Sequence, residues 1–247
     1  MAARLISAGN LRWLFAETLV IVLGVLIALG LDDSWTNRQD RLLAIDYIQR
    51  LQNDVNEDLR YIRETWLPRL RTKQDALDAI GPVVRGQVPV PEDVVTFLHN
   101  VARGGIMSGS AQPWFTDTTF EDLRSTGNLR LIRDPDLRAG IARYYGGMQA
   151  WFERLQGRHT NYVSYVHTAI PAEMRDDMGL EALEEFGVDY ALKRLLSDEF
   201  RNLANEEYNT MLFMQSLDFE RFAESLLSSL EAYRLELEGE NRGPIQL

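Results

Sequence analysis

The first strong pattern along the chain is an apolar segment near its start, WLFAETLVIVLGVLIALGL, which runs from Trp13 to Leu31. It holds nineteen residues, and Glu17 is the only charged one. A helix rises about 1.5 Å per residue, so the segment is about 28 Å long, close to the ~30 Å hydrocarbon core of a bilayer. The pattern predicts a transmembrane helix over residues 13–31, a short cytoplasmic tail over 1–12 and a water-exposed domain over 32–247.

Charges on either side of this segment predict its orientation. Arg4 and Arg12 precede it, whereas Asp32 and Asp33 follow it. Positive charge favours the cytoplasmic side, so we expect a single-pass protein of the bacterial inner membrane with its domain in the periplasm. Arg12 and Trp13 then lie at the cytoplasmic interface, and Asp32 and Asp33 lie at the outer one. Membrane lipid is therefore an expected partner.

A cleaved signal peptide is the alternative to a membrane helix, because residues 28–30 (Ala-Leu-Gly) resemble a small-residue cleavage site. Two features inside the segment matter if it stays in the membrane. Gly24 and Ala28 form a small-xxx-small pair that lets another helix approach closely, although small residues are common in membrane helices generally. Glu17 is costly inside a bilayer, so it needs a partner on another subunit unless its side chain reaches the headgroups.

A second apolar pattern follows, with helical spacing from about Asp32 to Ile80. Its apolar positions are separated by 3, 4, 4, 3, 4 and 4 residues: Ile48, Leu51, Val55, Leu59, Ile62, Trp66 and Leu70. Eleven residues in three turns stay nearly in phase with a straight helix, so this stripe predicts a stiff rod that continues the membrane helix. Such a stripe is typical of the core of a bundle. Pro68 should bend or end the helix nearby.

The middle of the chain alternates between breaks and short helices. Gly81-Pro82 and residues 85–91 indicate a break, residues 91–103 a helix, and the Gly/Ser-rich residues 104–113 a loop. The pattern Thr118-x-x-Glu121 is typical of a capping box that opens a short helix around 120–125.

The rest of the chain predicts long helices. Asp134-Pro135 supplies an N-cap and a proline at the first helical position of a helix that reaches about residue 168. Its tyrosines and tryptophan have helical spacing, which favours a core face over a ligand pocket. Residues 171–187 indicate a loop, and residues 189–238 one helix or two with a break near 215–218. The fold class is therefore all-α: a transmembrane helix that continues into an elongated up-and-down bundle.

Two blocks resemble a known family. They are ETLVIVLGVLIALGLDDSW with the later YIQRLQNDVNEDL, and FEDLRSTGNLRLIRDPDLRAGIARYY at residues 120–145. They are similar to an uncharacterised bacterial family of single-pass membrane proteins, a domain of unknown function. The resemblance implies a topology and helical content but no activity.

Charge and cysteine content exclude several classes of function. The net charge is −11; residues 1–31 contribute +1, and the remaining 24 basic and 36 acidic residues contribute −12. An acidic domain repels phosphate backbones, so nucleic acid is not an expected partner. The chain has no cysteine, which excludes disulfides, thiolate metal sites and cysteine nucleophiles.

The sequence contains no recognisable catalytic pattern, and we expect no cofactor and no metal. His99, His159 and His167 are the only histidines, and no H-E-x-x-H or E-x-x-H pair is present. Glycine patterns for nucleotides and the G-x-S-x-G pattern are also missing. One local basic surface stands out in the acidic domain. It either pairs internally with Glu206-Glu207 and the last helix, which we favour, or docks an acidic partner through Arg124, Arg130, Arg133 and Arg138.

These patterns favour a non-enzymatic accessory or scaffolding subunit of a larger membrane complex, for example a respiratory or photosynthetic one. One alternative is a periplasmic sensor or ligand-binding module, which would need a partner because a tail of about a dozen residues is too short for a signalling domain. A homo-oligomeric membrane assembly with Glu17 facing its axis is another alternative. An enzyme with an unrecognised site is the least favoured.

Overall fold

The computed structural model describes residues 8–108, 115–158, 160–170 and 188–240, with side chains for residues 17–239 of these ranges. Every regular element in this part of the chain is helical, which confirms the all-α class. In chain order the elements are α1 (Ala8–Tyr61), the π-helix η1 (Ile62–Trp66), α2 (Leu67–Val84), α3 (Val94–Gly104), α4 (Thr118–Ser125), the 3₁₀-helix η2 (Asn128–Leu131), α5 (Pro135–Gln156), α6 (Tyr162–Ala169), α9 (Val188–Leu195), α10 (Asp198–Gln215) and α11 (Phe219–Glu240).

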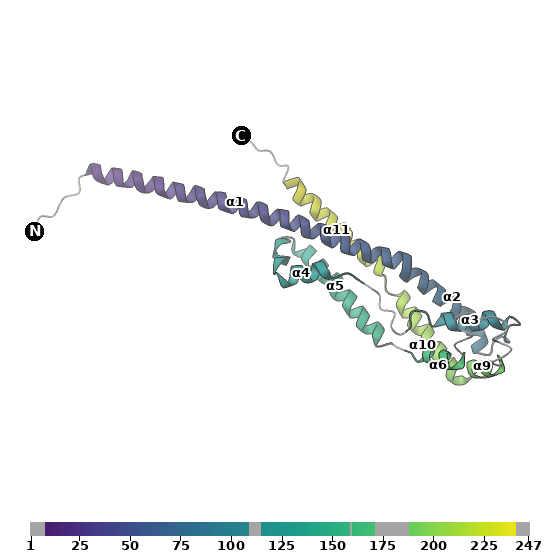
Figure 1. Ribbon diagram of the computed structural model, residues 1–247. Helices are drawn as coiled ribbons and strands as arrows, with labels where there is room; N and C mark the ends of the chain where they lie inside the picture. Colours follow the sequence, from purple (N-terminus) through teal and green to yellow (C-terminus); the bar gives the residue numbers. More distant parts are fainter. Residues whose placement is uncertain (1–7, 109–114, 159, 171–187, 241–247) are drawn as a thin grey trace, which may run out of the picture.

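A rod made of α1, η1 and α2 runs along the whole molecule (Figure 1). The 54 residues of α1 alone span about 80 Å at 1.5 Å per residue. Its first part stands free of the bundle, since every side chain from Glu17 to Gln39 is exposed. The first contact with the bundle is a hydrogen bond between Asn37 and Arg133, partial burial begins at Asp40, and Ala44 is the first fully buried position. The apolar stretch of this rod is long and apolar enough to cross a membrane, a property that signal sequences near an N-terminus share.

The eleven-residue stripe forms the core face of the rod, as its spacing predicts. All seven of its positions are buried and belong to one hydrophobic cluster: Ile48, Leu51, Val55, Leu59, Ile62, Trp66 and Leu70. The stripe stays on one face because 11 residues in three turns drift little around a straight helix.

Pro68 changes the rod without ending it. The helix widens to a π-turn over Ile62–Trp66 and resumes as α2 with Pro68 in its first turn, where a missing N–H costs least. The π-turn keeps Ile62 and Trp66 in the core, and the Trp66 ring packs edge-on against Phe219 at 5.6 Å between centroids. The break predicted at Gly81-Pro82 also comes slightly later, because α2 continues to Val84.

The other helices pack on the rod as an up-and-down bundle (Figure 1). Helix α11 runs back along α1, and α10 lies against α2. Helix α5 packs on α11, α4 contacts α1, and α3, α6 and α9 gather at the end far from the N-terminus. The C-terminal end of α11 and the α4–η2 segment thus form the end of the bundle nearest the free part of α1.

Several predicted helix boundaries are wrong. The single helix expected over 135–168 is two helices, because α5 ends at Gln156, before Gly157, and α6 begins at Tyr162. The predicted break near 215–218 is confirmed, but a second one separates α9 from α10, where Ser197 caps α10 by accepting from Phe200 N. The predicted loop over 171–187 and His159 lie outside the described residues.

The capping box predicted at Thr118 is also wrong. Helix α4 begins at Thr118 itself, and no side chain of its own segment caps it. A carboxylate of α1 does so instead: Thr119 N donates to Asp54 at 3.2 Å, while Asp58 holds the segment just before α4 by accepting from Thr116 N at 2.7 Å. The tertiary structure therefore supplies the cap from a helix sixty residues earlier.

Candidate functional site

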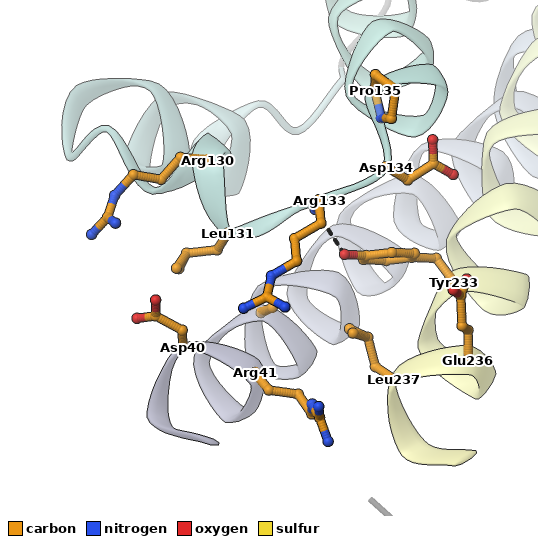
Figure 2. Close-up of a pocket in the computed structure, with 11 residues that line it drawn as sticks. Asp40, Arg41, Arg130, Leu131, Arg133, Asp134, Pro135, Tyr233, Glu236 and Leu237 are labelled. Atoms are coloured by element: carbon orange, nitrogen blue, oxygen red, sulfur yellow. Dashed lines mark hydrogen bonds between the residues drawn. The ribbon is translucent and has the colours of Figure 1, made fainter. Parts of the chain in front are cut away.

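A pocket of about 350 Å³ lies at the end of the bundle nearest the free part of α1 (Figure 2). We call it the stalk pocket. Three segments line it: α1, the connector from η2 to α5, and the last turns of α11. The lining residues are Asp40, Arg41, Ala44, Arg130, Leu131, Arg133, Asp134, Pro135, Tyr233, Glu236 and Leu237.

Local chemistry fixes the start of the connector. Gly127 has φ +72°, a left-handed conformation that glycine adopts at little cost, and it turns the chain from α4 into η2. Asn128 then donates its side-chain amide to Tyr47 OH at 2.9 Å, which ties η2 to α1. Leu131 and Ile132 are buried beneath it. The pocket wall is therefore held from below by core packing.

The end of the connector is held just as firmly. Arg133 N donates to Tyr233 OH of α11 at 2.8 Å. The Arg138 guanidinium donates to the carbonyls of Ile132 and Arg133 at 2.5 and 3.2 Å. Asp134 caps α5, as the sequence predicts, by accepting from the amides at positions 136 and 137. These bonds make the backbone that carries Arg133 rigid.

Residues of both charges line the stalk pocket. Its lining holds three arginines and three acidic residues. The Arg133 side chain extends toward α1, where its guanidinium donates to Asn37 at 2.8 Å, whereas Arg130 points away from the pocket (Figure 2). Within the described residues, neither arginine forms an ion pair, and neither Asp40 nor Glu236 does so. Opposite charges thus surround one cavity, and Arg133 and Glu236 enter it without an ion partner among the described residues.

The structure divides the predicted basic surface. Arg130 and Arg133 line the stalk pocket, whereas Arg124 pairs with Glu121 on its own helix and Arg138 binds backbone carbonyls. Internal pairing of these arginines with Glu207 is wrong, because Glu207 is buried elsewhere. Sequence proximity of the arginines gave no information on which way each side chain points.

Glu207 belongs to a buried polar cluster at the far end of the bundle, which the sequence did not reveal. Its carboxylate accepts from Lys73, Ser108 and Thr160. Lys73 also donates to the carbonyls of Gly104 and Ile106, each at 3.0 Å. Burial lowers the Lys73 pKa, and Glu207 opposes this. These contacts tie α2 and α10 to the segments after α3 and before α6, and we call them the Lys73–Glu207 clamp.

Asp58 is a second buried charge that periodicity did not indicate. It lies between Thr116 N and the Tyr144 hydroxyl, which donates to it at 2.9 Å. Burial raises the Asp58 pKa from 3.8 to about 6, against the lowering effect of these two hydrogen bonds. The predicted aromatic core face is confirmed, since Tyr144 and Tyr145 are buried near Asp58 and Tyr162 is buried at the far end of the bundle.

The residues predicted to act in the membrane lie on the free part of α1. Glu17 and Ala28 are exposed, and a Cβ added at Gly24 would meet nothing within 4 Å. Asp32 and Asp33 are exposed beyond the apolar stretch. For Arg12 and Trp13 the structure describes the backbone only. The helical register keeps Gly24 and Ala28 on one face, one turn apart.

Comparison with known protein families, characterised proteins and solved structures gave no match to this chain. Among the described residues, no group of three or more His, Cys, Asp or Glu side chains is arranged to hold a metal ion. The site must therefore be interpreted from its own geometry: a rigid, mixed-charge pocket beside a long apolar helix.

Proposed function

We propose that this chain is a non-enzymatic accessory subunit of the bacterial inner membrane that assembles into a larger membrane complex. In this proposal residues 13–31 cross the bilayer, the N-terminus is cytoplasmic and the bundle stands in the periplasm. The observation that carries the proposal is the continuity of α1, one helix from its apolar stretch to the bundle core.

The continuity of α1 matters because a flexible tether and a rigid connection place different requirements on the chain. A passive tether needs only a flexible linker, which leaves the domain free to rotate and drift. A continuous helix fixes the height and the direction of the domain relative to the bilayer. Asn37, the first residue of α1 that contacts the bundle, follows Leu31 by six residues, so the domain stands about 9 Å above the hydrocarbon core.

A fixed height is useful to a subunit that must meet neighbours both inside and outside the membrane. Inside the membrane, Gly24 and Ala28 offer a face for close helix packing, and Glu17 offers a carboxylate for a polar partner. Outside, the end of the bundle presents the stalk pocket. These features support a hetero-complex, with a homo-oligomer as the second candidate because the same small-residue face suits a second copy.

Mild detergent extraction followed by size analysis and mass spectrometry tests the proposal. We expect the wild-type chain to run in a stoichiometric complex with other membrane subunits. A six-residue Gly/Ser insertion between Asp33 and Ser34 should release it from that complex while it stays in the membrane, because the insertion uncouples the bundle from the membrane helix.

The matched control is the same insertion after Gly86, an exposed left-handed turn at the far end of the rod. This variant should keep the complex. A wild-type chain that runs as a lone monomer would sink the proposal. Full assembly of the Asp33–Ser34 insertion variant would show that α1 acts only as a tether and that its continuity is not needed.

A further inference from the structure

We propose that the stalk pocket binds the headgroup of a zwitterionic membrane phospholipid, one with a phosphate diester and a primary amine. The inference rests on the membrane anchoring in the proposed function, although it does not require a partner subunit. Four properties of the pocket support it: its height above the bilayer, its charges of both signs, its size and its rigidity.

The pocket lies a short distance above the lipid headgroups. Asp40 follows Leu31 by nine residues, so the pocket begins about 13 Å beyond the apolar stretch along α1. The headgroup layer itself extends about 5–7 Å beyond the hydrocarbon core. A helix tilt of about 20°, usual for membrane helices, lowers one side of the bundle, and the long Arg133 side chain reduces the remaining distance.

The charges match a zwitterion rather than an anion. A guanidinium recognises phosphate oxygens with charge-assisted hydrogen bonds, and Arg133 extends its guanidinium into the pocket (Figure 2). Glu236 and Asp40 supply carboxylates without ion partners among the described residues, and these suit a primary ammonium group. A purely anionic headgroup would leave the carboxylates facing a like charge, which disfavours it.

Size and rigidity limit the ligand to a headgroup. A volume of about 350 Å³ lies near the lower end of the ~300–1,000 Å³ range of small-molecule pockets. Acyl chains would stay in the bilayer. The hydrogen bond from Arg133 N to Tyr233 and the two from Arg138 hold the pocket backbone in place, so little order must be gained on binding.

The test is lipid retention by the full-length protein. Delipidated protein in detergent is titrated with phosphatidylethanolamine, phosphatidylcholine or phosphatidylglycerol of identical acyl chains, and bound lipid is counted by native mass spectrometry. We expect phosphatidylethanolamine to bind at least about tenfold more tightly than either competitor, the equivalent of one charge-assisted hydrogen bond. Phosphatidylcholine lacks amine protons, and phosphatidylglycerol lacks the amine.

Two variants remove the two halves of the recognition. Arg133→Gln removes the phosphate contact and Glu236→Gln removes the amine contact, and each should weaken phosphatidylethanolamine binding about tenfold. Both side chains are exposed, so neither change should unfold the bundle. The matched controls are Arg124→Gln and Glu121→Gln, which change the same charges in an ion pair outside the pocket and should leave binding unchanged.

Three results would overturn the proposal. They are equal retention of all three lipids, unchanged retention in both pocket variants, and full competition by an equal concentration of soluble glycerophosphoethanolamine, which would make a free solute the ligand. The outcome is independent of assembly: a lone monomer that retains phosphatidylethanolamine sinks the accessory-subunit proposal alone, and an assembled complex whose isolated chain retains no lipid sinks this one alone.

Discussion

At the scale of single residues, Asp58 shows how one buried carboxylate serves the fold at an energetic cost. Its oxygens hold the segment just before α4 and the Tyr144 hydroxyl, yet burial disfavours its charged form. The folded-state pKa of about 6 exceeds the ordinary value of 3.8. The stabilising contribution of this group is therefore fully present below about pH 4 and is lost as the pH rises through about 6.

The variant Asp58→Asn tests this dependence. In the wild type, ionisation of Asp58 should lower the free energy of unfolding by about 3 kcal/mol as the pH rises from about 4 to about 6. An amide cannot ionise, so this decrease should be absent in the variant. The measurement is denaturant unfolding of the full chain in detergent at several pH values, with circular dichroism as the readout. Glu57→Gln, one residue away and exposed, should keep the wild-type slope. A wild-type slope in Asp58→Asn would contradict the assignment.

At the scale of elements, the Lys73–Glu207 clamp joins four segments that are distant in sequence. Lys73 lies on α2 and Glu207 on α10, with Ser108 after α3 and Thr160 before α6. Both residues are buried, with an exposed fraction of 0% for Lys73 and 1% for Glu207. Hydrophobic packing alone does not fix how helices slide along one another, and the clamp supplies a specific register at this end of the bundle.

Removing one side of this clamp should be far worse than removing both. Lys73→Met leaves a buried, unpaired carboxylate and should cost about 3–5 kcal/mol of unfolding free energy. The double variant Lys73→Met with Glu207→Leu should recover most of that loss, because no unpaired charge remains. Denaturant unfolding of the single and double variants forms a double-mutant cycle that measures the coupling. A cost below about 1 kcal/mol for Lys73→Met would show that the pair is not the clamp described.

At the scale of the whole molecule, the proposed assembly depends on one face of the free part of α1. Gly24→Leu adds bulk to the small-residue face and should detach the chain from its complex in mild detergent, as judged by size analysis. Val22→Leu is the control. Position 22 lies about 200° around the helix from position 24, so this variant should remain assembled. Equal behaviour of the two variants would remove this face from the interface.

The two parts of the molecule differ in how far sequence reasoning reached. The rod was predictable, because burial of the stripe from Ile48 to Leu70 depends only on periodicity within one helix. The caps were predictable where cap and helix are adjacent, as at Asp134 and α5. The same reasoning failed at α4, because Asp54 reaches its first turn from another helix.

At the candidate site, too, the sequence predicted local features but not contacts between distant segments. The sequence drew attention to Arg130 and Arg133 but not to Asp40, Tyr233 or Glu236, which complete the stalk pocket. These residues come from three segments spread over nearly two hundred positions, and no local pattern relates them. Ser197 is a different case: a serine followed by two acidic residues is a local helix-start signal, and the prediction for residues 189–238 missed it by placing the only break near 215–218.

The sequence by itself determined the apolar helix, the straight core stripe and the all-α class, because each follows from spacing along one segment. Only the tertiary structure decided which polar side chains meet. It pairs Lys73 with Glu207 across 134 positions, and it gathers the charges of the stalk pocket at the end of α1. The physical reason is that hydrophobic periodicity specifies a buried face, whereas hydrogen bonds and ion pairs need two groups brought to contact distance by the packing of whole helices.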